Sequence, residues 1–194
     1  MKTIKRIFTA CFLVLLSTSL FAQEYKQPVK QAVRISIEGL LGEIEIEGYQ
    51  GSELMIQADE LEQKPERAKG LKPVYKNGIT DNTGIGLNIT EAGEVIEITG
   101  ASKQSENGKY LFKVPAGIAL SVDAKSPFAN EDIRVNNMGS ELEIKTMDGD
   151  IYLEAITGPA VISTMNGNVE ATFNKVNQDN PSSITSMNGH IDIT

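Results

Sequence analysis

The stretch Thr146-Met147-Asp148-Gly149-Asp150-Ile151 decides how this chain folds, because close copies of it return twice. The copies are Thr164-Met165-Asn166-Gly167-Asn168-Val169 and Ser186-Met187-Asn188-Gly189-His190-Ile191. Their methionines lie 18 and then 22 residues apart, from 147 to 165 and from 165 to 187, a spacing typical of solenoid coils. The repeat therefore predicts a chain that winds through successive stacked coils.

Each copy stands between two short runs in which apolar and polar residues alternate, the pattern of a half-buried β-strand. Stacking of equivalent positions predicts buried columns, and equivalent hydroxyls would bridge from coil to coil. The hydroxyl column comprises Thr146, Thr164 and Ser186. The apolar columns are Ile144, Ile162 and Ile184; Ile151, Val169 and Ile191; and Leu153, Ala171 and Ile193.

The Asx-Gly pair at the centre of each copy predicts a corner, with Gly149, Gly167 and Gly189 expected at positive φ. The same pair between alternating strands is also the usual hairpin signal, so an antiparallel β-sandwich is the alternative architecture. A sandwich gives no reason for one corner to repeat. The sequence therefore favours an all-β fold of the parallel β-solenoid, or β-helix, type.

The alternation of apolar and polar residues starts at Val33, so the predicted solenoid domain covers residues 33–194. Residues 23–32 are polar without periodicity and are predicted to form a flexible leader. A short helix is expected within residues 60–68, and the Ser-rich connection over residues 100–107 is expected to be exposed. Further strands are expected over residues 33–37, 43–47, 54–58, 85–89, 95–98, 110–114 and 118–122.

Residues 1–22 have the three parts of a secretory signal peptide. Lys2, Lys5 and Arg6 form the basic start, residues 7–16 are almost wholly apolar, and Ala22 is a small residue suited to cleavage. The apolar run is shorter than a membrane-spanning helix requires. We therefore expect export, cleavage after Ala22 and a mature chain without a transmembrane segment, located in the periplasm, on the outer-membrane surface or outside the cell.

Cys11 is the single cysteine, and it lies inside the expected signal peptide. The sequence Phe8-Thr9-Ala10-Cys11 superficially matches a lipoprotein cleavage site, but cleavage there would leave the apolar run 12–16 on the mature protein. Removing residues 1–22 leaves 15 of the 18 basic residues against 26 acidic ones, a net charge of −11. Such a surface repels phosphate backbones, which argues against nucleic acid as a partner.

Carboxylates suited to acid or base chemistry gather near the first copy of the repeat. The densest group comprises Glu141, Glu143, Asp148 and Asp150. Carbohydrate-active enzymes on β-helix scaffolds use such groups, but no feature of the sequence indicates a cleft, and a solvated outer face is the simpler interpretation. His190 is the single histidine, so the chain has no second imidazole for catalysis or for a multi-histidine metal site.

Oxygen ligands suited to calcium recur at the corners. They belong to Asp148, Asp150, Asn166 and Asn168. The Gly-Gly-x-Gly-x-Asp repeat that binds calcium between coils is absent, however, and Gly84-Ile85-Gly86 lacks the third glycine of a dinucleotide fingerprint. We therefore expect no metal, no cofactor and no catalytic residues.

Met147, Met165 and Met187 have the outward parity of the strand that precedes each corner. An exposed methionine column is an adaptable apolar surface, so these three residues are the candidate partner-binding stripe. The chain has no Trp, and its tyrosines are scattered, which argues against an aromatic sugar cleft. These features favour a binding protein, with an extracellular carbohydrate-active enzyme on a β-helix as the alternative.

Three further segments carry a resemblance to a known group: Gly42-Glu43-Ile44-Glu45-Ile46, Val114-Pro115-Ala116-Gly117-Ile118-Ala119-Leu120 and the Asx-Gly phrases. Together they resemble the secreted bacterial domains of unknown function that are grouped as adhesins, and the likeness covers nearly all of the chain after residue 22. The resemblance implies a right-handed parallel β-solenoid of the Gram-negative envelope, with no known catalytic residues to carry over. From the residues themselves we expect a non-enzymatic protein whose sheet faces or edges bind a protein or a surface polysaccharide. Members of that group usually continue through further coils, so the domain is predicted to be truncated after Thr194. The segments 59–76 and 81–84 depart from the group's pattern.

Overall fold

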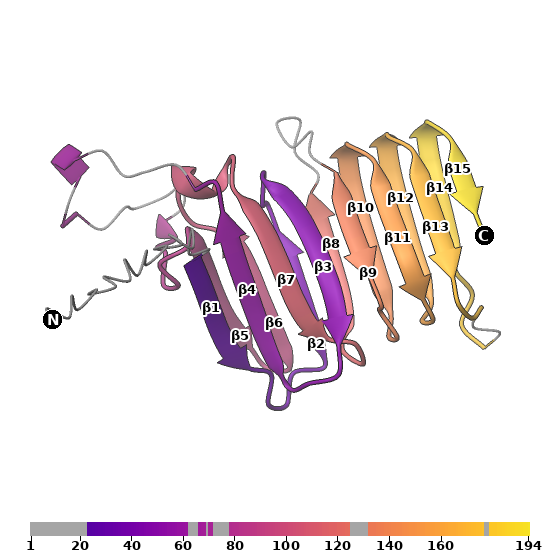
Figure 1. The fold of residues 1–194 in the computed structure, drawn as a ribbon, viewed down its shortest axis with the longest axis horizontal. Coiled ribbons are helices and arrows are strands. Elements are labelled where there is room, and N and C mark those ends of the chain that lie inside the picture. The colour runs from indigo at the N-terminus through magenta and orange to yellow at the C-terminus, as the bar shows by residue number, and fades with distance from the viewer. Residues whose placement is uncertain (1–22, 62–65, 69, 72–77, 125–131, 177–178) are drawn as a thin grey trace, which may run out of the picture.

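The computed structural model describes residues 23–61, 66–68, 70–71, 78–124, 132–176 and 179–194. Over these residues the chain is all-β, with two sheets that lie face to face and short 3-10 turns at η1 (Glu66–Ala68) and η3 (Lys103–Ser105) (Figure 1). The expected signal peptide lies outside the described residues. Within the described ranges, no helix has the length and apolar character needed to cross a membrane.

Sheet A has eight strands and sheet B has seven. The spatial order of sheet A is β1 (Gln23–Pro28), β4 (Glu53–Asp59), β7 (Lys109–Pro115), β3 (Glu43–Tyr49), β9 (Ile133–Asn136), β11 (Ile151–Ile156), β13 (Val169–Phe173) and β15 (Ile191–Ile193). The order of sheet B is β5 (Leu87–Ala92), β6 (Val95–Gly100), β2 (Arg34–Glu38), β8 (Ala119–Ala124), β10 (Leu142–Asp148), β12 (Ala160–Asn166) and β14 (Ser183–Asn188). The antiparallel pairs β1–β4, β4–β7 and β5–β6 lie at one end, and the other described pairs are parallel.

Consecutive strands from β8 to β15 alternate between the two sheets, so each strand pairs in parallel with the strand two places later. The predicted alignment of the apolar columns is confirmed by the register: Ile144 pairs with Ile162, and Ile162 pairs with Ile184. The other two columns likewise align across β11, β13 and β15. Their side chains point between the sheets, because apolar residues at alternate positions all face one side of a strand. The predicted burial is wrong for the last coil, where Ile191 and Ile193 are 43% and 55% exposed, because no described strand lies beyond β15.

The pair β2–β3 occupies a position that the sequence does not predict. In space it lies between β6–β7 and β8–β9, although β6 and β7 follow it by some 45 residues or more in the chain (Figure 1). Ile46 of β3 is consequently flanked by Phe112 and Val135, and the three side chains are at most 1% exposed. Strand alternation shows which side chains are buried, but it contains no information about which strand lies alongside.

Two segments differ from the sequence-based expectation. Residues 23–28, expected to belong to a flexible leader, form β1, and Tyr25 packs against the core. The connection 100–107, expected to be exposed, buries Ala101, Ser102 and Ser105. The small side chains allow this segment to pass close to the loop before β5, where the Ala101 N–H donates to the carbonyl of Gly86 at 2.8 Å.

The corner glycines serve two different purposes. Gly149 has φ of +91°, as predicted, whereas Gly167 and Gly189 are not among the residues at positive φ. A Cβ atom on Gly167 would lie 2.1 Å from the carbonyl oxygen of Gly149, and one on Gly189 would lie 2.1 Å from that of Gly167. The prediction of positive φ is therefore wrong for the second and third corners, where glycine is needed because one backbone passes against the next.

Thr146 and Thr164 of the hydroxyl column are buried beside these corners and Ser186 is half-buried, but the three hydroxyls do not bridge to one another as predicted. Thr146 Oγ1 donates to the Asp148 carbonyl at 2.6 Å, and Ser186 Oγ donates to the Gly167 carbonyl at 2.9 Å. Thr164 Oγ1 is buried and has no hydrogen-bond partner among the described residues. The same position thus holds a satisfied hydroxyl in one coil and an unsatisfied one in the next.

This difference predicts opposite results for one substitution at Thr146 and Thr164. Thr146→Val is expected to lower the free energy of unfolding by about 1–2 kcal/mol, because it leaves the Asp148 carbonyl without its donor. Thr164→Val is expected to be neutral or to stabilise by up to about 1 kcal/mol, because it removes a buried hydroxyl without a partner. Urea denaturation of both variants measures the difference, and equal costs at the two positions would contradict it.

Candidate functional site

The predicted stripe of Met147, Met165 and Met187 lies on the outer face of sheet B. The residues before and after each methionine align in the register, so the three methionines occupy equivalent positions on β10, β12 and β14. Their exposure increases along the stack: Met147 is half-buried, Met165 is 41% exposed and Met187 is 71% exposed. Val161, also outward on β12, is 43% exposed, but the polar Ser163 separates it from Met165 along the strand.

The four carboxylates of the predicted acidic cluster separate into two groups. Glu141 and Glu143 lie with β10 on sheet B, where Arg34 reaches them across β8 at 3.0 Å and 3.7 Å. Lys145 forms an ion pair with Glu143, and this hydrogen bond and charge raise the pKa of the lysine. Asp148 and Asp150 lie instead at the corner between β10 and β11.

Asp148 begins a ladder of side-chain amides along the corners. Asn166 Nδ2 donates to Asp148 Oδ1 at 2.9 Å, and Asn188 Nδ2 donates to Asn166 Oδ1 at 2.9 Å. The ladder has a direction, because the Asp148 carboxylate can only accept hydrogen bonds. The Asn166 amide then donates to the residue before it in the ladder and accepts from the residue after it. The Asx residues therefore hold successive corners in register.

A second ladder runs beside the first. Asp132 Oδ1 accepts the Asp150 N–H at 3.1 Å, and Asp150 Oδ1 accepts the Asn168 N–H at 2.7 Å. Asn168 Oδ1 in turn accepts the His190 N–H at 2.9 Å. The oxygens considered for calcium are thus used in bonds between coils. Among the described residues, no group of three or more His, Cys, Asp and Glu side chains is placed to share a metal ion.

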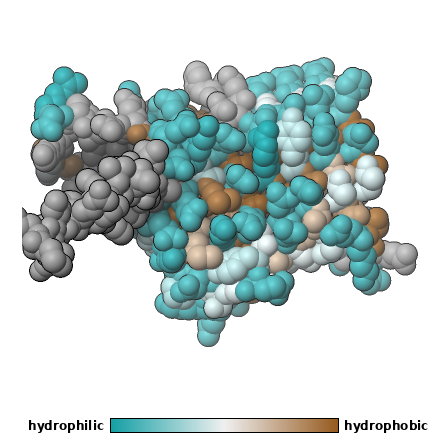
Figure 2. Space-filling view, viewed as in Figure 1, coloured by the Kyte–Doolittle hydropathy of each residue, from teal (hydrophilic) through white to brown (hydrophobic). Residues whose placement is uncertain are grey.

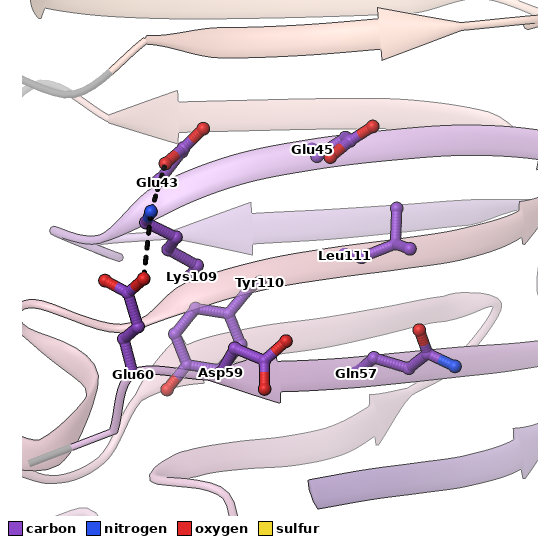
Figure 3. A pocket seen from close by; sticks show the side chains of 8 residues that line it. All are labelled: Glu43, Glu45, Gln57, Asp59, Glu60, Lys109, Tyr110 and Leu111. Carbon is purple, nitrogen blue, oxygen red and sulfur yellow. Dashed lines mark ion pairs between the residues drawn. The ribbon is translucent and has the colours of Figure 1, made fainter. Parts of the chain in front are cut away.

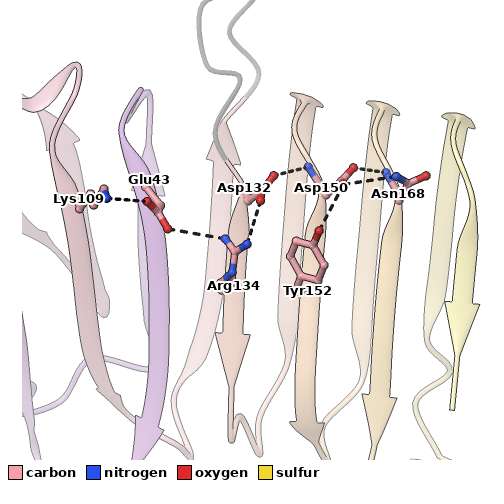
Figure 4. Close-up of polar contacts among 7 residues, drawn as sticks. All are labelled: Glu43, Lys109, Asp132, Arg134, Asp150, Tyr152 and Asn168. Carbon is pink, nitrogen blue, oxygen red and sulfur yellow. Dashed lines mark hydrogen bonds and ion pairs between the residues drawn. The ribbon is translucent and has the colours of Figure 1, made fainter.

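A row of polar side chains crosses the outer face of sheet A from β7 to β13 (Figure 4). Its members are Lys109, Glu43, Arg134, Asp132, Asp150, Tyr152 and Asn168. Arg134 is the centre of the row, paired with Asp132 at 3.0 Å and with Glu43 at 3.7 Å. The guanidinium also lies 4.7 Å from the centre of the Tyr152 ring, a cation–π geometry. Desolvation and then the carboxylates of Asp132 and Asp150 raise the pKa of Tyr152.

An acidic hollow of about 600 Å³ lies on sheet A beside this row (Figure 3). It is lined by Glu43, Glu45, Gln57, Asp59, Glu60, Lys109, Tyr110 and Leu111. The Lys109 ammonium group forms ion pairs with Glu60 at 3.1 Å and with Glu43 at 3.9 Å. It therefore links carboxylates on two sides of the hollow. Sequence reasoning missed this group because its carboxylates come from two distant segments, residues 43–45 and 59–60, which lie on either side of β7.

Figure 2 shows this face of the molecule. It is mostly hydrophilic, with apolar residues visible across the middle and at the end where β15 lies. Ile191 and Ile193 of β15 are 43% and 55% exposed. The methionine stripe belongs to the other sheet, so the two outer faces differ in the chemistry that they present.

The buried Tyr110 is expected to make the stability of the protein decrease at alkaline pH. Its ring is 1% exposed and its hydroxyl donates to the Ile85 carbonyl at 2.8 Å. Burial, and then the nearby charge of Asp81, raise the pKa of this hydroxyl above its ordinary value. Its contribution to stability is fully present below about pH 10 and is lost as pH rises, by about 1.4 kcal/mol per pH unit, because the unfolded chain releases the proton first.

Tyr110→Phe tests this pH dependence. At neutral pH the variant is expected to be less stable than the wild type by about 1 kcal/mol, the usual value of one hydrogen bond. Above about pH 10 the difference is expected to narrow, since phenylalanine has no proton to release. Denaturant titrations at several pH values measure both slopes, and parallel slopes for the two proteins would contradict the assignment.

The chain was compared with protein-family models and with curated proteins, and neither comparison found a match.

Proposed function

We propose that residues 33–194 form a right-handed parallel β-solenoid. The strict alternation of β8 to β15 between the sheets, with parallel pairing at every step, supports this architecture. The corner ladders support it as well, because equivalent side chains bond from one turn of the chain to the next. An experimental electron-density map tests the proposal, and a left-handed path through β8 to β15 would contradict it.

We infer that the protein binds a protein or a surface polysaccharide without catalysing a reaction, as an adhesin-like component of the cell envelope. The observation that supports this proposal is the row of Met147, Met165 and Met187 on a regular sheet face, in which Met165 and Met187 are exposed. Methionine side chains are flexible and polarizable, so a stripe of them suits an apolar partner surface or the nonpolar face of a sugar. The row is available on the outer face of three neighbouring strands.

A double variant, Met165→Gln with Met187→Gln, tests the stripe. The wild-type protein would be screened on a glycan array and against envelope proteins, and the affinity for each hit would be measured for both proteins. We expect the double variant to lose at least about tenfold in affinity, or about 1.4 kcal/mol. Val176→Gln is the matched control, because Val176 is 66% exposed but lies outside the stripe. Equal affinities for wild type and double variant would contradict the proposal.

Export is a separate part of the proposal. Fractionation of a Gram-negative host that expresses the full sequence would locate the protein, and N-terminal sequencing would identify the mature terminus. We expect a chain that starts at Gln23 and lies outside the cytoplasm. A cytoplasmic protein that retains Lys2 to Arg6 would contradict this expectation.

A carbohydrate-active enzyme is the alternative, and the acidic hollow on sheet A is the observation that favours it. Its carboxylates have the chemistry of acid and base catalysts of glycoside hydrolysis. Incubation with the same glycans, followed by analysis of chain length, would detect depolymerisation. Loss of that activity in Glu45→Gln would assign it to the hollow. Loss in Asp148→Asn or Asp150→Asn would assign it to the corner.

A further inference from the structure

One edge of sheet B is formed by β5, which pairs with β6 on one side and with no described strand on the other. Alternate residues of an edge strand direct their backbone N–H and C=O groups away from the sheet, where they can pair with another chain. On β5 these residues include Leu87 and Ile89, because both of them bond outward to residues 82–83. Parity makes Glu91 the next outward residue.

Asn82 and Thr83 occupy the four outward groups of Leu87 and Ile89. Asn82 Oδ1 accepts the Ile89 N–H at 2.9 Å, and Asn82 Nδ2 donates to the Ile89 carbonyl at 2.8 Å. The Asn82 backbone N–H and Thr83 Oγ1 bond the Leu87 carbonyl at 3.2 Å and 3.0 Å. Thr83 Oγ1 also accepts the Leu87 N–H at 3.3 Å.

The amide of Asn82 has the same donor and acceptor as a peptide group. One side chain therefore makes on Ile89 the two bonds that a residue of a neighbouring strand would make. Asparagine is suited to this position because aspartate lacks the donor and leucine lacks both groups. The segment reproduces the pairing of a strand without presenting a new edge of its own.

Asp81 holds the segment in this conformation. Its carboxylate accepts the N–H groups of Thr83 at 2.9 Å, Gly84 at 2.8 Å and Gly86 at 3.1 Å. The two glycines have φ of +81° and +84°, which the tight loop requires. Ile85 between them is 2% exposed, and its carbonyl receives the Tyr110 hydroxyl described above. The loop is thus held by the Asp81 carboxylate on one side and by the Tyr110 hydroxyl in the core on the other.

The edge of sheet A at the same end of the molecule is also modified. The Val29 N–H donates to the Ser52 carbonyl at 3.0 Å, so the nitrogen of Pro28 faces away from β4 by parity. Proline has no N–H to offer a new strand. Gln27 Nε2 also bonds Glu91 Oε1 at 2.6 Å, which ties the two edge strands β1 and β5 together. Both sheets therefore have features here that oppose further strand pairing.

We propose that residues 82–83 are an edge cap, which fills the strand position beside β5 and prevents this edge of sheet B from pairing with a second copy of this chain. Removal of the cap exposes the backbone N–H and C=O groups of β5. A twofold axis would then place β5 antiparallel to β5 of the second copy, so that the two strands pair. The sequence Asp81-Asn82-Thr83-Gly84, which departs from the pattern of the adhesin-like domains, acquires in this way a defined role.

Asn82→Ala tests the cap, because it removes both side-chain bonds to Ile89. We expect the circular dichroism spectrum of the wild type, and a mass in sedimentation equilibrium that increases with concentration toward twice the wild-type value. Asn88→Ala is the matched control: Asn88 Nδ2 bonds the Thr80 carbonyl at 2.8 Å, but it covers no outward group of β5. The control is expected to keep the wild-type mass. A folded Asn82→Ala variant with the wild-type mass at all concentrations would overturn the proposal.

Hydrogen exchange on the wild-type protein gives a second test that does not depend on the folding of a variant. The capped amides of Leu87 and Ile89 are expected to exchange at least about tenfold more slowly than that of Glu91 on the same edge. Exchange of all three amides at one fast rate would overturn the proposal, whatever the mass of the variants.

Discussion

Replacement of Gly167 by alanine is expected to lower the free energy of unfolding by about 3 kcal/mol or more. The new Cβ would lie 2.1 Å from the carbonyl oxygen of Gly149 and 2.9 Å from its carbon. Both atoms belong to the backbone, so no rotamer change relieves the contact and the second corner must move away from the first. That movement would also stretch the ladder bond from Asn166 to Asp148, which is 2.9 Å long.

Thermal denaturation measures this effect, and the midpoint is expected to fall by roughly 6–12 °C. Gly117→Ala is the control, because a Cβ at Gly117 meets nothing within 4 Å and its φ is not in the positive range. Alanine there is expected to leave stability unchanged or to raise it by up to about 1 kcal/mol, since it restricts the unfolded chain. Equal loss of stability in both variants would contradict the close approach of the corners as the cause.

The repeat allowed the second half of the fold to be predicted in residue detail. The columns of Ile144, Ile151 and Leu153 follow from repetition alone, because equivalent residues must align once one coil lies on another. The repeat also placed the methionine stripe on one face, since parity along a strand is fixed. It did not give the exposure of each methionine, which depends on neighbouring strands.

The first half could not be predicted in the same way. Nothing local in residues 43–49 indicates that residues 109–115 lie alongside, and the insertion of β7 between β3 and β4 assembles the acidic hollow as a consequence. The edge cap could not be predicted from the sequence either. Asn82 replaces a peptide group only because its amide lies beside the Ile89 backbone, and the sequence does not show that contact. Side-chain bonds to distant backbone leave no periodic signal in a sequence.

The two ends of the described stack also use different kinds of interaction. Asx ladders hold the corners from β8 onward, whereas antiparallel strands and the cap form the end at β1 and β5. Because the ladders repeat one unit, loss of a single Asx side chain affects two neighbouring corners. The pair β2–β3 lies between the strands before β8 and the strands from β8 onward, so its contacts connect the two halves of the fold. Loss of these contacts is expected to affect the whole molecule.

Ile46→Ala tests that connection, and it is expected to lower the free energy of unfolding by about 3–5 kcal/mol. Ile46 is 0% exposed, and its neighbours in the ladder are Phe112 on β7 and Val135 on β9. Truncation would leave a cavity between strands that the main chain holds in place by hydrogen bonds on both sides, so the site has little freedom to collapse. The cost should therefore lie in the upper part of the range for this substitution.

Ile193→Ala is the matched control, because the same atoms are removed from a side chain that is 55% exposed on β15. Its cost is expected to stay within about 0.5 kcal/mol, the usual range for surface substitutions. Urea denaturation followed by two probes separates global from local loss. If β2–β3 connects the halves, Ile46→Ala shifts the signal of Tyr152, which lies on β11 two strands away, and the overall circular dichroism together. A shift confined to circular dichroism, with the Tyr152 transition unchanged, would mean that the two halves unfold independently and that the inserted pair does not couple them.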